Sequence, residues 1–284
     1  MDGAAAMVLL AVVAVVTLVG VGSVLLDGSR VYGRDLLWLA GRPVTEQEAD
    51  VCARYLRRHR VHRVVGGLAG VAVGLVYGTR WDGSAGLSIG GAGGPLGDVL
   101  FCGVAGVIVG ALSAESFRLR LPLTGPVAAS LAPRPGLPLR RTVVSAWALV
   151  ALGAGIAVAG LAWQGDPVGL QAVALGVVML GLGTATRRAI ARRRRPVLSE
   201  RALELDGRMR GFASASVAHL QASAGWLVVF WALVALPRDI TGWSAVFGVA
   251  SLGAFVLAIV QLRRAAPRPP RRWGAPPVPR TAPA

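Results

Sequence analysis

Lysine and asparagine are absent from this sequence of 284 residues, so all 30 basic side chains are arginine. Without lysine the chain cannot form a Schiff base with retinal, and it cannot build a P-loop, whose lysine holds nucleotide phosphates. Retinal rhodopsins and P-loop NTPases are therefore excluded. The codons of both missing residues are rich in adenine, which indicates a bacterial genome of high GC content.

Cysteine and histidine are scarce, and their positions argue against a disulfide or a metal site. Cys52 falls in a basic loop and Cys102 in the middle of an apolar run, so the two cannot easily meet. His59 and His62 share one side of a helix, but Cys52 lies too far along that helix to share an ion with both. The surrounding arginines also repel a cation. We therefore predict no catalytic residues, no cofactor and no metal.

Long apolar runs are abundant instead. Hydrophobic residues make up 54% of the chain, and its mean hydropathy is +0.60. Because a run of about 20 apolar residues spans a bilayer as a helix, we predict an all-α, polytopic transmembrane bundle. Its seven predicted spans are residues 4–26, 64–79, 95–113, 142–163, 168–186, 213–236 and 243–262. The first has no basic residue before it and no cleavage site after it, which favours a retained span over a signal peptide.

The arginines between the spans predict the orientation. Residues 27–63, 114–141, 187–212 and 263–284 hold 28 of them, and the other links keep only Arg80 and Arg238. Arginines near span ends stay cytoplasmic, so we predict an outer N-terminus and an inner C-terminus in a bacterial cytoplasmic membrane, crossed several times. The net charge of +16 is then explained by arginine-rich loops that face an anionic inner leaflet. It does not indicate that the protein binds nucleic acid.

Two short motifs match known patterns without the context that those patterns need. Residues 121–125 read LPLTG, a sortase signal, yet they fall in a predicted inner loop with four spans after it. Residues 86–90 read GLSIG, the pattern of a hydrolase nucleophile elbow. No strand pattern surrounds it, and all three histidines lie on the opposite side. We interpret both motifs as products of composition.

Three basic segments on the predicted inner side are candidates for binding. Residues 42–63, with a capping-box pattern at Thr45 and Glu48, and residues 192–213 are amphipathic, so we expect two cytoplasmic helices lying along the inner leaflet. Their apolar stripes are Val51, Cys52, Tyr55, Leu56 and His59 in the first, and Ala202, Leu205, Met209 and Phe212 in the second. Residues 263–284, rich in proline and arginine, predict an extended, disordered tail. The expected partners are the anionic lipid surface and a cytoplasmic protein bound through one of these segments.

Glycines with helical spacing mark the second and third spans. They are Gly66, Gly70, Gly74 and Gly78 in the second, and Gly103, Gly106 and Gly110 in the third. Stripes of small residues let helix backbones approach closely in a membrane. Because each stripe supplies a partner for the other, we predict a tight hairpin between these spans. An oligomer interface is the alternative.

Charged residues are missing from the centres of the predicted spans. Ion-coupled transporters usually keep a carboxylate or an arginine there, so proton-driven transport is not expected. The most polar stretch within a span is His219, Gln221 and Ser223, at the inner end of the sixth span. These side chains can line a path for a small solute, or they can hydrogen-bond neighbouring helices, which we favour.

Two sequence fragments recur along the chain. Arg-Pro-Val occurs at residues 42–44 and 195–197, and FCGVAG at 101–106 has a counterpart, FGVAS, at 247–251. A parallel duplication of residues 1–120 and 168–265 would explain both, as in some transporters. Convergence of a simple composition explains them better, and the duplication stays the alternative.

The stretches LFCGVAGVIVGALSAESFRL (100–119) and RYLRRHRVHRVVGG (54–67) resemble multi-span membrane proteins of unknown function from high-GC actinobacteria. The resemblance implies a bacterial cytoplasmic membrane and no functional residues. The sequence as a whole favours a non-enzymatic scaffold, or a component that binds lipid or a partner, with a basic cytoplasmic face. A small-solute permease or channel is the alternative, and an intramembrane enzyme is the third hypothesis.

Overall fold

The computed structural model describes residue 22 and residues 29–78, 94–116, 139–164, 167–192, 200–236 and 243–269. Within these residues the secondary structure is helical, without a strand, so the all-α prediction is confirmed. The helices are α2 (Gly33–Ala40), α3 (Glu46–Gly78), α4 (Gly94–Ser116), α5 (Arg140–Gln164), α6 (Val168–Arg192), α7 (Glu200–Val234) and α8 (Trp243–Arg264).

Four of the described helices, α5 to α8, are long and apolar enough to cross a membrane, which indicates a membrane protein. Helix α4 contains a shorter apolar stretch, Val99–Glu115. The spans expected at 142–163, 168–186 and 243–262 each lie within one helix of similar length. The span expected at 4–26 lies outside the described residues apart from Gly22. The structure thus supports four spans by length and composition, and the number seven stays a prediction.

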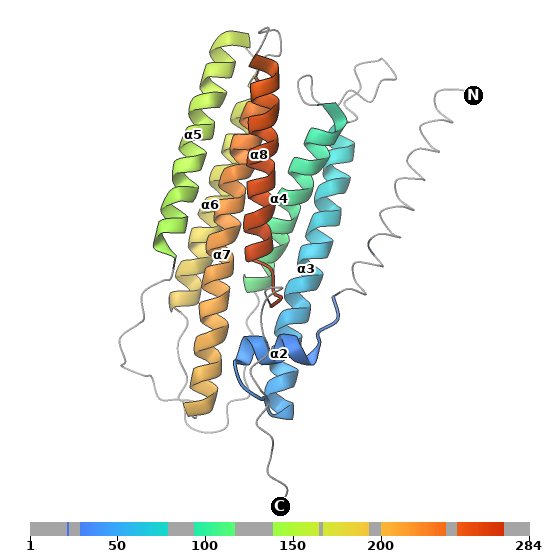
Figure 1. Cartoon of the computed structure of the whole chain (residues 1–284), viewed down its shortest axis with the longest axis vertical. Helices are drawn as coiled ribbons and strands as arrows, with labels where there is room; N and C mark the ends of the chain where they lie inside the picture. Colours follow the sequence, from blue (N-terminus) through green and yellow to red (C-terminus); the bar gives the residue numbers. More distant parts are fainter. Residues whose placement is uncertain are drawn as a thin grey trace, which may run out of the picture.

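Helix α7 is the centre of the bundle. In Figure 1 the long helices run up and down beside one another, and α5, α6 and α8 each pack against α7. Within its apolar stretch 78% of the residues are buried, against 33% or less in α5, α6 and α8. Large apolar side chains such as Leu152 of α5 and Val249 of α8 are exposed instead. This distribution is expected where lipid covers the outer helices.

Helices α3 and α4 form a close hairpin beside this group. A Cβ atom added to Gly66 would lie 2.3 Å from the carbonyl oxygen of Gly106. A Cβ atom on Gly70 would lie 2.0 Å from the carbonyl oxygen of Cys102. Only glycine permits two helix backbones to approach so closely, because real Cβ atoms do not occupy such distances.

One end of the bundle is extended by α2 and by the N-terminal parts of α3 and α7 (Figure 1). We call residues 29–63 and 200–212 the basic head. The capping box predicted at Thr45 and Glu48 is confirmed: the Thr45 amide donates to the Glu48 carboxylate at 2.8 Å, and the Glu48 amide donates to the Thr45 hydroxyl at 3.4 Å. Gly41 ends α2 with a positive φ of 72°, a left-handed cap that favours glycine.

The prediction of two separate interfacial helices is wrong. Residues 46–63 continue without a break into the apolar half of α3, and residues 200–212 continue into α7. Their apolar stripes face each other instead of lipid: Cys52, Tyr55 and Leu56 of α3 cluster with Leu205, Met209 and Phe212 of α7. The two apolar stripes thus cover each other at the same end of the bundle. Neither stripe therefore needs a membrane surface to cover it.

The chain after α8 also differs from the predicted tail. Helix α8 continues to Arg264, and Ala265 and Pro267 are buried. Residues 270–284, the rest of the predicted tail, lie outside the described residues.

Candidate functional site

A buried ion pair joins α2 to α3 in the basic head. The Arg60 guanidinium donates to Asp35 Oδ2 at 2.8 Å, and the two residues are only 5% and 2% exposed. The same guanidinium donates to the carbonyl oxygens of Arg30 and Pro267. A buried charge is tolerated when it is paired and its remaining donors are satisfied, as they are here. Arg60 therefore fixes three segments to one another: the entry to α2, helix α3 and the end of α8.

A second arginine, Arg63, binds the end of α8 one turn further along α3. It donates to the carbonyl oxygen of Ala265 and, at 3.3 Å, to the hydroxyl of Ser216. Ser216 of α7 also donates to the Ala265 carbonyl at 2.8 Å. The last carbonyls of a helix lack partners within it and carry partial negative charge, so arginine donors stabilise that end.

A carboxylate and a histidine meet in the same region. The Tyr55 hydroxyl donates to Glu115 Oε1 at 2.8 Å, and His59 Nε2 lies 3.1 Å from the same oxygen. The contact with His59 is close but lies outside hydrogen-bond geometry. Glu115 is at the end of α4, and it is 2% exposed while His59 is 1% exposed. Because neither side chain is accessible, the pair is placed to hold α3 against α4, and a substrate has no approach to it.

Ion pairs close the outer surface of the head. Arg201 donates two hydrogen bonds to the Glu48 carboxylate, each of 2.6 Å. These bonds hold the pKa of the Glu48 carboxyl at about 2, well below its usual value. Arg42 forms a further ion pair with Glu204 at 3.0 Å. Ion pairs as well as apolar contacts therefore hold residues 42–63 and 200–212 together.

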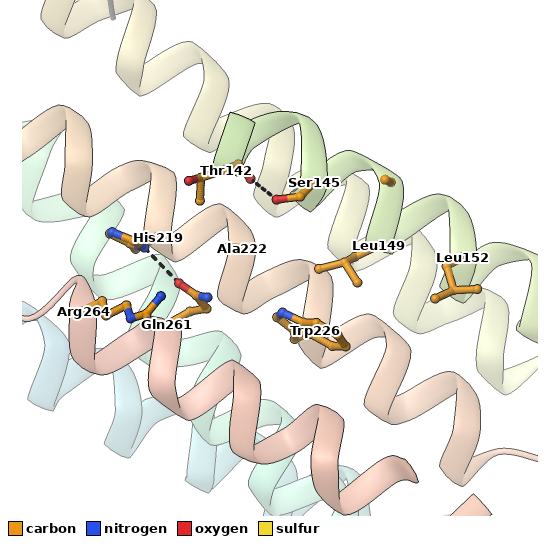
Figure 2. Close-up of a pocket in the computed structure, with 10 residues that line it drawn as sticks. Thr142, Ser145, Leu149, Leu152, His219, Ala222, Trp226, Gln261 and Arg264 are labelled. Carbon is orange, nitrogen blue, oxygen red and sulfur yellow. Dashed lines mark hydrogen bonds between the residues drawn. The ribbon is translucent and has the colours of Figure 1, made fainter. Parts of the chain in front are cut away.

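A lateral groove lies between α5 and α8, with α7 as its floor (Figure 2). Its volume is about 380 Å³. It is lined by Thr142, Ser145, Ala148, Leu149 and Leu152 of α5, His219, Ala222 and Trp226 of α7, and Gln261 and Arg264 of α8. Polar residues line the end near the basic head, and apolar residues line the part further along the helices. The groove is thus polar at one end and apolar at the other.

The three polar residues predicted at the start of the sixth span do not share one path. His219 lies in the groove, where its Nδ1 is 2.9 Å from Gln261 Oε1. Gln221 turns toward α6 and donates to the Leu180 carbonyl at 3.0 Å and the Thr184 hydroxyl at 2.9 Å. Ser223 donates to the Ala258 carbonyl of α8 at 2.8 Å. The physical reason is helical: two residues span about 200° around the axis, so Gln221 points away from the other two.

The predicted glycine residues lie where α3 meets α4, as far as they are described. Gly66, Gly70, Gly106 and Gly110 approach the opposite backbone, and Gly103 lies against the Val71 side chain. Gly74 is buried, and Gly78 ends α3. The stripes of the two helices supply each other's partner within this chain.

The described residues contain no group of three histidine, cysteine or acidic side chains able to hold a metal ion. Cys52 is fully buried in the head, and burial raises the pKa of its thiol to about 11. The buried pairs Arg60–Asp35 and Tyr55–Glu115 were not predicted from the sequence. Their partners are 25 and 60 residues apart, and nothing marks one arginine among many as buried.

No protein-family model, no curated protein and no solved structure matches this chain.

Proposed function

We propose that this chain is an integral protein of the bacterial cytoplasmic membrane with seven spans, an outer N-terminus and an inner C-terminus. The four long apolar helices support a membrane location, and α4 and the apolar half of α3 supply two more spans in the proposal. Gly22, in the first proposed span, lies against Leu68 of α3. In the described residues the arginines lie toward one end of the bundle, the end expected to face an anionic inner leaflet.

Within that topology, we propose that the protein acts as a non-enzymatic scaffold whose basic inner face binds anionic lipid or an acidic cytoplasmic partner. The observation that carries the proposal is how the polar side chains of α7 are used. Ser216, Gln221 and Ser223 are each 3% exposed or less, and each donates a hydrogen bond to a neighbouring segment. Such bonds join helices, and they leave these three side chains with no donor to guide a solute.

The exposed arginines give the binding surface. Those at the basic end include Arg34, Arg54, Arg57, Arg140, Arg141, Arg188, Arg192, Arg263, Arg264 and Arg268. Each arginine near an anionic surface contributes about 1 kcal/mol of attraction, so a cluster favours strong binding. The buried network of Arg60 and Arg63 holds the head in a fixed position relative to the bundle, which suits a docking surface.

Co-purification from the native membrane tests the scaffold. A stoichiometric protein partner, lost from the variant Arg54→Gln/Arg57→Gln and kept by the buried-core control Cys52→Ala, supports it. The alternative hypothesis, a permease, is based on the groove at His219. Uptake of a small solute by the pure protein in liposomes would establish the permease and overturn the scaffold.

A further inference from the structure

The groove between α5 and α8 has the shape and chemistry of a lipid site. We propose that it binds one anionic phospholipid, with the phosphate at Arg264 and one acyl chain along Leu149, Leu152 and Trp226. This inference rests on the proposed function only for the choice of leaflet: in the proposed topology the lipid comes from the inner one.

Charge favours an anionic headgroup. Among the described residues, no acidic side chain lines the groove. The guanidinium of Arg264 is exposed and has no acidic partner in the described part of the chain. A phosphate is a preferred partner for arginine because its oxygens accept the donors of the guanidinium. One end of the groove therefore carries a positive charge that no acidic side chain of the described residues compensates.

Of the neighbouring polar groups, Gln261 adds a donor at the same level. Since Gln261 Oε1 accepts from His219 Nδ1 at 2.9 Å, the amide nitrogen of Gln261 is left to donate to a ligand. The Ser145 hydroxyl donates to the Thr142 carbonyl at 2.9 Å, so it offers a ligand only its lone pairs. In Figure 2 the labelled residues Arg264, Gln261 and His219 lie together at one end of the view, with Thr142 above them.

The length of the groove matches one leaflet. From Thr142 to Leu152 a helix rises about 15 Å, which is half of the roughly 30 Å hydrocarbon thickness of a bilayer. The polar residues lie near the start of α5, near the end of α8 and at His219 of α7, and the apolar residues lie further from the basic head on α5 and α7. A lipid fits this order, with its headgroup at the end and its chain reaching the midplane. Leu152 is 54% exposed, so an acyl chain would cover apolar surface there.

Lipid retention by the full chain tests the site. The protein is reconstituted in vesicles of phosphatidylglycerol and phosphatidylcholine, re-extracted in mild detergent and weighed by native mass spectrometry. We expect one retained phosphatidylglycerol per chain and no retained phosphatidylcholine. Arg264→Gln should lower this retention about fivefold, whereas Arg208→Gln should keep it, because exposed Arg208 is paired with Glu204 and does not line the groove.

A second pair of variants tests the apolar part. Ala148 and Ala151 are both exposed on α5, but only Ala148 lines the groove. Ala148→Trp should fill the groove and displace the lipid, and Ala151→Trp should not. Equal retention by Arg264→Gln and Arg208→Gln, displacement of the bound mass by inorganic phosphate alone, or a second protein chain in place of the lipid would each overturn the proposal. An inverted membrane orientation with lipid retained would refute the proposed topology and leave the lipid site standing.

Discussion

Arg60 and Asp35 form an ion pair of 2.8 Å inside the basic head, and the same guanidinium reaches the backbone after α8. The pair thus connects the start of the described chain with its end. Together with Arg63 and Ser216, it makes the position of α8 depend on α3 and α7. The head and the bundle are expected to unfold as one unit, because their buried donors are shared.

Removing the charge of Asp35 should destabilise the protein strongly. Asp35→Asn leaves the Arg60 guanidinium buried without its counterion, and the expected loss is about 3 kcal/mol in the free energy of unfolding. The matched control is Asp50→Asn, since the Asp50–Arg54 pair is 63% exposed on both sides and contributes less than about 1 kcal/mol. Unfolding of the purified variants in detergent measures both values. Equal losses would contradict the buried pair.

A methyl group at Gly66 should separate α3 from α4. Its Cβ atom would lie 2.3 Å from the Gly106 carbonyl oxygen and 2.9 Å from the Gly110 Cα atom, and backbone cannot yield as a side chain can. We expect Gly66→Ala to cost about 1–3 kcal/mol in the same unfolding assay. Gly155→Ala is the control because its Cβ atom would meet nothing within 4 Å. If Gly66→Ala proved as stable as that control, the close hairpin would be wrong.

The Cys52 thiol should not react while the protein is folded. It is fully buried, and its pKa is raised to about 11, so little thiolate exists near neutral pH. A Cys102→Ser variant leaves Cys52 as the one thiol of the chain. We expect a maleimide to label this variant only after denaturation, as read by mass. Rapid labelling of the native protein would show that the head is open.

The Glu48–Arg201 pair should stabilise the head less as the solution becomes acidic. The pKa of Glu48 is lowered from 4.5 to about 2, so its contribution is complete above the unfolded value of 4.5 and is lost as the pH falls toward 2. We expect the difference in melting temperature between wild type and Glu48→Gln to shrink as the pH falls from about 6 to about 3. A difference independent of pH would assign the effect to something other than this carboxylate.

The sequence predicts the long helices well and their side-chain partners poorly. Hydropathy alone locates α5, α6 and α8, because an apolar run of this length predicts a spanning helix whatever packs around it. The stripes of Cys52 and of Leu205 are also visible, but a stripe does not say whether lipid or another stripe covers it. Which arginine pairs with Asp35 depends on where α2 folds back on α3, and that is a property of the tertiary structure. The groove likewise needs three helices, which no single span reveals.

The side of the membrane that holds the basic head is the claim on which the proposed function most depends, and a reporter fused after residue 205 tests it. Alkaline phosphatase is active only when exported, and a fluorescent protein that folds in the cytoplasm serves as the reciprocal reporter. We expect fluorescence and no phosphatase activity at this position. Phosphatase activity without fluorescence would place the arginines outside and contradict the proposed topology.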